Sequence, residues 1–168
     1  DRAARVQIHR IADGGLYDRL GTTEPEREAE SSIDRYVLRE EIGRGGSSVV
    51  HRAEQTTPVA REVALKILRA RHLDPLSRQR FLGEQQVLAA LEHPNVARVF
   101  DAGTTSDGQP FFAMELVRGA SIVEYAADHA LSRADRVRLF LQACAGTEHA
   151  HRRGVIHRDL KPSNLLVA

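Results

Sequence analysis

The sequence is poor in cysteine, tryptophan and long apolar runs. Its 168 residues include no Trp and a single Cys, at position 144. One cysteine cannot form an internal disulfide, and such scarcity is typical of proteins in a reducing compartment. No apolar stretch approaches the ~20 residues that a membrane-spanning helix needs, and the polar, Arg-rich start does not resemble a signal peptide. The sequence therefore predicts a cytoplasmic location and no membrane segment within these residues.

The sequence also has little net charge and few lysines. The formal net charge is +1, which gives no electrostatic reason to expect nucleic acid as a partner. Of the 24 basic residues, only Lys66 and Lys161 are lysines. An ammonium group is a compact point charge and a guanidinium group is a planar fork, so the two are not interchangeable where the amine itself is needed. We therefore take both lysines as candidate functional residues.

Hydrophobic patterning predicts an α+β fold. Alternation of apolar and polar residues predicts five strands, over 36–43, 48–54, 61–68, 96–102 and 109–116. Helical spacing and capping residues predict helices over 74–91, 121–129 and 132–153. Gly146 would cost the last helix about 1 kcal/mol relative to Ala. Val6, Ile8 and Ile11 predict a short helix, and residues 22–32 are polar enough to be a linker.

Two motifs in the first half of the chain each allow an ordinary and a functional interpretation. Gly43 and Gly45 lie between two strands, where the turn is either a tight hairpin or a loop that lets the backbone approach a phosphate. Lys66 lies in the apolar strand sequence VALK, and Glu84 lies on the apolar face of the following helix. A buried charge is costly unless it is paired, so the two predict a buried ion pair. Alternatively, both side chains reach solvent at the edges of their elements.

The strongest motif is HRDLKPSN at 157–164, directly before an apolar segment. It places Asp159, Lys161 and Asn164 within six residues. A carboxylate can accept a hydroxyl proton, an ammonium group can stabilise phosphate charge, and an amide oxygen can bind a metal ion. This combination is typical of phosphoryl transfer.

Taken together, the motifs resemble the protein kinase family. IGRGGSSVV, VALK, the helix with Glu84, HPNV, MEL and HRDLKPSN follow one another in the order and spacing of that family, over about residues 36–168. The similarity is greatest to the bacterial kinases that resemble eukaryotic Ser/Thr kinases. It implies a five-stranded antiparallel N-lobe sheet with one helix, over about 36–117, and the first helices of an incomplete α-helical C-lobe, over about 118–168. Residues 1–32 would be an N-terminal extension to a kinase domain at 33–168.

The resemblance also implies site residues, with ATP and Mg²⁺ as cofactors. Lys66 would hold the α- and β-phosphates and pair with Glu84, Asp159 would orient and deprotonate the substrate hydroxyl, Lys161 would steady the γ-phosphate, and Asn164 would bind Mg²⁺. The remaining ATP contacts would come from the Gly-rich turn, its flanking strands, the hinge-like segment and the strand after the catalytic loop: Ile42, Gly43, Arg44, Gly45, Gly46, Ser47, Ser48, Val50, Ala64, Met114, Glu115, Val117 and Leu166.

The resemblance predicts a Ser/Thr protein kinase whose partner is a protein with a Ser or Thr acceptor. The alternatives are a nucleotide-binding pseudokinase that acts as a scaffold and, less favoured, a small-molecule kinase. The family's Asp-Phe-Gly segment and activation loop would follow residue 168, so we expect these 168 residues alone to have little activity. We also expect the helix over 132–153 to expose apolar area and the chain to self-associate. Cys144 is expected in the core, because it lies on the apolar side of that helix.

Overall fold

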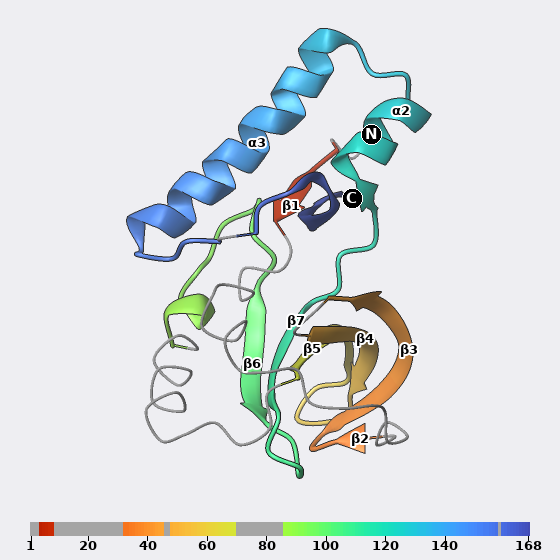
Figure 1. Ribbon diagram of the computed structural model, residues 1–168, viewed down its shortest axis with the longest axis vertical. Helices are drawn as coiled ribbons and strands as arrows, with labels where there is room; N and C mark the ends of the chain where they lie inside the picture. Colours follow the sequence, from red (N-terminus) through yellow and green to blue (C-terminus); the bar gives the residue numbers. More distant parts are fainter. Residues whose placement is uncertain (1–3, 9–31, 46–47, 70–85, 158) are drawn as a thin grey trace. The chain divides into compact units, whose positions relative to one another are not determined.

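The computed structural model describes residues 4–8, 32–45, 48–69, 86–157 and 159–168. The chain divides into two compact units (Figure 1). Unit 1 consists of Asp1–Gly14, Ala90–Arg98 and Val117–Ala168, and unit 2 of Gly15–Ala89 and Val99–Leu116. Lys66 therefore belongs to unit 2 and the HRDLKPSN motif to unit 1, and each unit is described by itself.

Unit 2 is built on an antiparallel sheet of six strands among the described residues. The strands lie in the order β2-β3-β4-β5-β7-β6. In chain order they are β2 (Ser32–Ile33), β3 (Tyr36–Arg44), β4 (Ser48–Gln55), β5 (Arg61–Leu68), β6 (Val99–Thr104) and β7 (Pro110–Glu115). The five predicted strands are confirmed, but the expected number of strands was wrong. The sixth, β2, is only two residues long and folds back onto β3 through a turn in which Asp34 has φ +51°, so it has too few residues to show an alternating pattern.

The core of unit 2 lies on one face of this sheet. Strand alternation sends Val63, Leu65 and Ile67 of β5 to the same side. They form a buried cluster with Ile33, Tyr36, Ala53, Phe111 and Ala113. The alternate residues of β5 consequently point to the opposite face, and these include Lys66.

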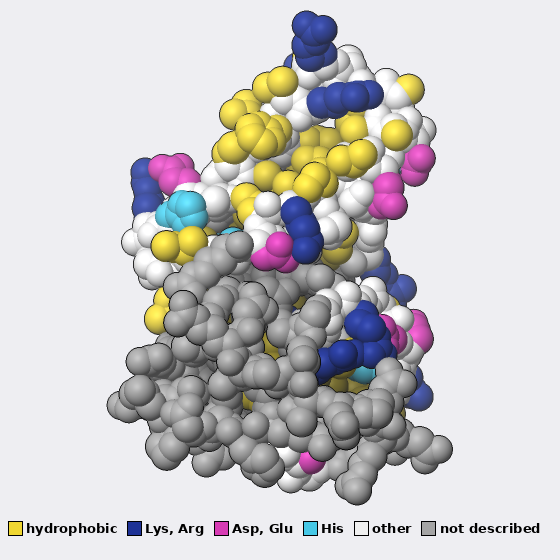
Figure 2. Space-filling model, viewed as in Figure 1, with side chains coloured by type: hydrophobic (Ala, Val, Ile, Leu, Met, Phe, Trp, Pro, Cys, Tyr) yellow, Lys and Arg dark blue, Asp and Glu magenta, His cyan; other side chains and the backbone are white. Residues whose placement is uncertain are grey.

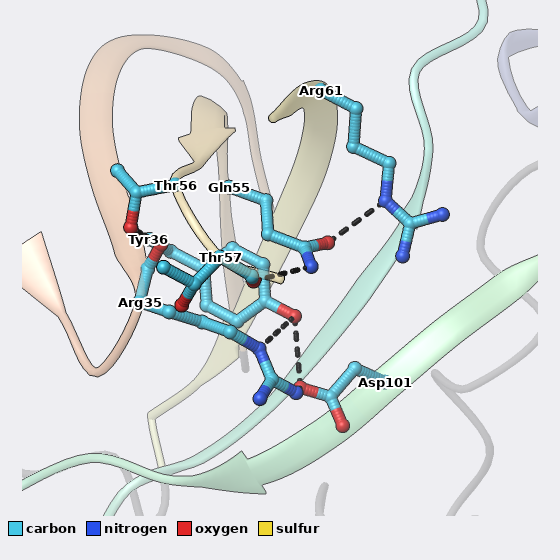
Figure 3. Close-up of polar contacts among 7 residues, drawn as sticks. All are labelled: Arg35, Tyr36, Gln55, Thr56, Thr57, Arg61 and Asp101. Atoms are coloured by element: carbon cyan, nitrogen blue, oxygen red, sulfur yellow. Dashed lines mark hydrogen bonds and ion pairs between the residues drawn. The ribbon is translucent and has the colours of Figure 1, made fainter. Parts of the chain in front are cut away.

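A polar network joins two strands that are far apart in the sheet (Figure 3). The hydroxyl of Tyr36 on β3 donates to Asp101 Oδ2 on β6 at 2.8 Å, and Arg35 Nη2 donates to the same oxygen at 2.6 Å. Three strands separate β3 from β6 in the sheet order. The contact therefore requires the sheet to curl strongly, as β3 does in Figure 1. No sequence pattern predicts this network.

The predicted helix over 74–91 is described only in its last part. Residues 86–89 are helical, and Leu88 and Leu91 are buried as the spacing predicts. Phe81 and Glu84 lie outside the described residues.

Unit 1 contains the two helices predicted from their caps. α2 (Ile122–Asp128) begins after Ser121, which forms a capping box with Glu124. α3 (Arg133–Arg152) begins after Ser132, whose hydroxyl accepts a hydrogen bond from the Asp135 amide at 3.2 Å. The helix ends before Gly154, which has φ +78° and so adopts a conformation that suits glycine. Local sequence therefore determines where both helices begin and end.

A small sheet in unit 1 corrects the prediction for the start of the chain. Residues 6–8 form strand β1 (Val6–Ile8), not part of a helix. β1 pairs antiparallel with β9 (Leu165–Val167), and β9 pairs antiparallel with β8 (Ala120–Ser121). The 3₁₀ turn η1 (Pro162–Asn164) leads directly into β9. The helical spacing was misleading because Val6 and Ile8 are buried by partners that lie far away in the sequence.

One face of α3 exposes apolar side chains, as predicted. Val137, Phe140 and Leu141 are 50–60 % exposed, and apolar side chains gather over α3 in Figure 2. Cys144 is exposed as well, so the prediction that it lies in the core was wrong. It lies one turn beyond Leu141 and is not covered by any described residue. Among the described helices, none combines the length and apolar character that crossing a bilayer would require.

Candidate active site

Four of the predicted ATP-binding residues share one face of the unit 2 sheet. Val50 lies opposite Lys66, and Ala64 lies opposite Met114, in the registers of β4–β5 and β5–β7. Ala64 and Lys66 are two residues apart on β5, so all four side chains leave the sheet on the same side. This is the face opposite the apolar core cluster. The register therefore brings together residues that lie up to 64 positions apart in the printed sequence.

Lys66 is completely buried at the centre of this face. Its strand neighbours in register are Val50 and Phe112, which are also buried. A buried ammonium group requires a partner to offset the loss of hydration, and the structure excludes the alternative that Lys66 reaches solvent at a strand edge. Its predicted partner, Glu84, lies outside the described residues.

The Gly-rich turn closes β3 onto β4. Gly43 and Arg44 are in register with Val50 and Val49, and the Gly45 amide donates to the carbonyl oxygen of Ser48 at 2.8 Å. Ser48 is buried, whereas Ile42 is exposed. Gly46 and Ser47 lie outside the described residues. The turn thus joins two antiparallel strands, and the approach of its backbone to a phosphate stays a prediction.

The three other predicted ATP contacts come from both units. Glu115 follows Met114 as the last residue of β7, in unit 2. Val117 and Leu166, both half-buried, belong to unit 1. Leu166 is the central residue of β9, where it pairs with Gln7 on one side and Ser121 on the other.

The HRDLKPSN segment brings its three candidate catalytic side chains into contact within unit 1. Lys161 Nζ lies 2.9 Å from Asp159 Oδ2. The side-chain amide of Asn164 donates to the backbone oxygen of Asp159 at 2.7 Å and to its Oδ2 at 3.2 Å. The Asp159 amide in turn donates to the carbonyl oxygen of His157 at 2.8 Å. These bonds hold the carboxylate between an ammonium group and an amide.

The electrostatics of this loop favour an ionised carboxylate. The hydrogen bond from Lys161 lowers the pKa of Asp159 below its usual range, and the bond from Asn164 adds to the effect. Asp159 therefore carries its negative charge at neutral pH, as a group that is to orient a hydroxyl and accept its proton must.

Asn164 has the features of a metal ligand. Its side chain is buried, and its Nδ2 is used by the two bonds to Asp159. Its Oδ1 is buried and has no hydrogen-bond partner among the described residues. An unsatisfied buried amide oxygen is costly, and Mg²⁺ binds carboxylate and amide oxygens. The Oδ1 atom of Asn164 therefore fits the chemistry of a Mg²⁺ ligand, and its binding of the ion stays a prediction.

His157 also takes part in the loop geometry, although it was not predicted as a site residue. Its ring is buried, and Nδ1 lies 3.3 Å from the Asp159 amide, which donates to it. The ring thereby holds the backbone on which the Asp159 carboxylate depends. Its place two residues before Asp159 in the motif was the signal that could have identified it.

Comparison with known proteins agrees with this geometry. The family model for the protein kinase domain matches residues 36–168. The probable serine/threonine-protein kinase PknB of Lactococcus lactis is 36% identical over 137 residues, which cover 80% of this chain and 22% of that protein. The serine/threonine-protein kinase PknB of Mycobacterium leprae is 36% identical over 140 residues, with the same coverage. The chain thus spans about a fifth of the length of these relatives.

Solved structures show the same relationship. The PknI kinase domain of Mycobacterium tuberculosis aligns with a TM-score of 0.66 and 29% identity, over 80% of this chain and 55% of that domain. The matched region includes both the Lys66 face and the HRDLKPSN loop. The chain belongs to the protein kinase family.

Proposed function

We propose that this chain is the catalytic part of a Ser/Thr protein kinase, which transfers the γ-phosphoryl group of ATP to a Ser or Thr hydroxyl of a protein. The observation that carries the proposal is the loop in which Lys161 and Asn164 both hold the Asp159 carboxylate. Family membership and the kinase names of the relatives support it.

Asp159, Lys161 and Asn164 each have a separate role in this reaction. The substrate hydroxyl oxygen forms a bond to the γ-phosphorus while the bond from that phosphorus to the β–γ bridging oxygen breaks, and ADP leaves. The hydroxyl proton passes to the Asp159 carboxylate. Lys161 stabilises negative charge on the transferred group, and Asn164 Oδ1 would hold Mg²⁺. When bound, Mg²⁺ supplies positive charge that neutralises the phosphate oxygens.

The face of the unit 2 sheet that carries Lys66 would bind the nucleotide. Lys66 would bind the α- and β-phosphates, with Glu84 as its ion-pair partner, while Val50, Ala64 and Met114 pack against adenine. Gly43 and Gly45 would let the backbone approach the phosphates. The backbone of Glu115 and Val117 would bind the adenine edge, and Leu166 would contact adenine. The remaining contacts would come from the turn: Ile42, Arg44, Gly46, Ser47 and Ser48.

The test is transfer of radiolabelled γ-phosphate from Mg-ATP to a protein acceptor by the full-length protein that contains this chain. Asp159→Asn should lower the rate by roughly 10²–10⁴-fold, because general-base assistance is lost. Asp128→Asn is the matched control, since Asp128 is an exposed carboxylate at the end of α2. An Asp159→Asn protein as active as the parent would refute the assignment. Nucleotide binding without any transfer by the parent would favour the pseudokinase alternative.

We also propose a cytoplasmic site of action, which the single cysteine and the use of ATP support. Fractionation of cells that make the full-length protein would test this, and recovery of the kinase unit outside the cytoplasm would contradict it.

We infer that the exposed apolar face of α3 promotes self-association. Val137, Phe140 and Leu141 lie at i, i+3 and i+4 on that face and are each about half exposed or more. Phe140→Ser with Leu141→Ser should lower the apparent mass in sedimentation velocity at high concentration. Arg138→Ser, on the same helix, is the control. Equal sedimentation of the parent and the double variant would contradict this inference.

A further inference from the structure

Unit 1 brings two histidine rings together where the turn that begins at His93 meets the C-terminal part of α3. The rings of His93 and His149 have centroids 4.8 Å apart and are tilted by 39°. One turn earlier in α3, Gly146 lies against the same segment, where an added Cβ atom would be 2.7 Å from the Asn95 carbonyl oxygen. The segment therefore rests on α3 at two successive turns of the helix.

Each ring accepts a hydrogen bond from a group that can only donate. The backbone amide of Asn95 lies 3.1 Å from His93 Nδ1, and Arg153 Nη1 lies 3.2 Å from His149 Nδ1. A backbone N–H and a guanidinium group carry protons but no acceptor. Both Nδ1 atoms are therefore unprotonated, and each ring is neutral with its proton on Nε2. We name this contact, formed by His93, Asn95, Gly146, His149 and Arg153, the histidine junction.

The surroundings of His149 disfavour its protonated form. Its Nε2 atom is buried and has no hydrogen-bond partner among the described residues. Burial lowers the pKa of His149 below the ordinary value of 6.5. Arg153, His93 and Arg152 lower this pKa further, in that order. The junction is thus stable only while His149 is uncharged.

No described carboxylate offsets the positive charges beside the two rings. On α3, Glu148 pairs with Arg152 at 2.7 Å, and both side chains are more than half exposed. On the facing segment, Glu92 pairs with Arg98 at 3.5 Å and is 73% exposed. A proton on either ring would add a positive charge near Arg153. It would also turn an acceptor into a donor that faces another donor.

The same hydrogen bonds argue against a metal ion between the rings. A histidine that binds a metal through Nε2 carries its proton on Nδ1 and donates it to an acceptor. Here both Nδ1 atoms face donors instead. Within the part of the chain that the structure describes, no three His, Cys, Asp or Glu side chains are grouped to hold a metal ion. The junction is suited to respond to protons.

The histidine junction lies just before the HRDLKPSN loop in the chain. α3 ends at Arg152, and the loop begins at His157. The backbone amides of Arg153 and Val155 both donate to the Ala150 carbonyl oxygen at 3.0 Å, so the chain leaves the helix in a fixed direction. Opening of the junction would loosen this last turn and, with it, the start of the loop (Figure 1).

We propose that the histidine junction makes unit 1 acid-sensitive: His93 and His149 hold the end of α3 in place while both rings are neutral, and protonation releases it. His149 is thereby a positioning residue for the HRDLKPSN loop. Only the effect on phosphate transfer rests on the function proposed above.

The junction should weaken as the pH falls below the ordinary pKa of histidine. Because the pKa of His149 is lowered in the folded protein, its contribution to stability is complete above 6.5 and is lost as the pH falls through the folded-state pKa. One pH unit below the ordinary pKa, a ring that must stay neutral lowers the equilibrium constant for the closed junction about tenfold. Exchange of the Asn95 backbone amide reports this closure, because that amide donates to His93.

The experiment is hydrogen exchange of the full-length protein that contains this chain, with rates corrected for the intrinsic pH dependence of exchange. Protection of the Asn95 amide should fall about tenfold between about pH 7.5 and about pH 5.5. Protection of the Leu65 amide, in the centre of the unit 2 sheet, should stay within about twofold. Equal protection of Asn95 at both pH values would overturn the proposal. An equal fall at Leu65 would also overturn it, because it would indicate general unfolding in acid.

A variant without titrating rings separates protonation from a merely structural role. In the double variant His93→Asn with His149→Asn, each new Oδ1 can replace the Nδ1 acceptor but does not titrate. Protection of the Asn95 amide should then change less than about twofold between the two pH values. His151→Asn is the matched control, because His151 is an exposed histidine two positions further along α3. A double variant that keeps the parent's pH dependence, or a control that loses it, would overturn the proposal.

Arg153→Gln decides the matter if the double variant fails to fold. Arg153 is exposed, and glutamine keeps a donor for His149 while it removes a positive charge that opposes protonation. The fall in Asn95 protection should be smaller in this variant than in the parent. A fall as large as the parent's would overturn the proposal.

Phosphate transfer measures the effect on the loop. The transfer rate of the parent should fall more steeply between the two pH values than that of the double variant. Asp159 does not cause this difference, because its pKa lies below the ordinary value of 3.8. Equal pH profiles would overturn the positioning role of His149. A parent that shows the exchange behaviour but transfers no phosphate would refute the proposed function and support the acid-sensitive junction.

Discussion

The two sheets of this protein differ in where their strands come from. In unit 2, β3, β4 and β5 follow one another along the chain and pair as successive hairpins, and β6 pairs with the next strand, β7. In unit 1, the three strands come from residues 6–8, 120–121 and 165–167. Alternating patterns and turn residues predict hairpins because the pairing partners are close in sequence. They do not predict pairing between segments that are separated by most of the chain.

The difference extends to how each sheet supports the site. The face of unit 2 that carries Lys66 follows from the register of neighbouring strands. The HRDLKPSN loop in unit 1 continues into β9, which lies between two strands from distant parts of the chain. We therefore expect substitutions in unit 1 to contradict local sequence rules more often than those in unit 2.

Gly146→Ala should give the largest effect, with a sign opposite to the one that local sequence predicts. Helix propensity alone would stabilise the chain by about 1 kcal/mol. The added Cβ would lie 2.7 Å from the Asn95 carbonyl oxygen, and overpacking of this kind costs about 1–3 kcal/mol. We expect net destabilisation by about 1–2 kcal/mol in urea unfolding. The control is Ala145→Gly on the exposed side of α3, which should lose about 1 kcal/mol through propensity. A stabilised Gly146→Ala chain would show that Ile8 and the Asn95 backbone move enough to accommodate the added Cβ.

Tyr36→Phe should test whether long-range contacts also matter in unit 2. The variant keeps the buried ring and removes the hydroxyl that donates to Asp101. Because the acceptor is charged, we expect a loss of about 1.5 kcal/mol. Burial also raises the pKa of Tyr36, so its hydroxyl remains a donor throughout the neutral range. Tyr125→Phe, in α2, serves as the control and should change the midpoint much less. Equal midpoints for both variants would mean that the curl of the sheet does not depend on this network.

The smallest expected effect is the pH dependence from Asp159. Its folded-state pKa lies below the ordinary value of 3.8, so its contribution to stability is present above that value and is lost as the pH falls through the folded-state pKa. The free-energy difference between the parent and Asp159→Asn should therefore be largest at neutral pH and shrink below about pH 4. High salt should reduce it as well, since the carboxylate is partly exposed. A difference that grows on acidification would contradict the lowered pKa.

Much of the fold and the candidate loop could be predicted from the sequence. Ser121 and Ser132 mark the starts of α2 and α3, and Gly154 marks the end of α3, because capping acts between neighbouring residues. Alternation predicted five strands of the unit 2 sheet for the same reason. Asp159, Lys161 and Asn164 come together because six residues of chain join them.

Tertiary structure alone decided the rest. Val6 and Ile8 belong to a strand because Asn95, Gln142 and β9 satisfy their backbone, and none of these lies nearby in sequence. Gly146 is required by the approach of the Asn95 carbonyl oxygen, although the helix by itself disfavours it. Cys144 is exposed because no described residue covers its side of α3. Local sequence determines backbone conformation through short-range sterics and caps. Burial of a side chain depends instead on which distant segment packs against it.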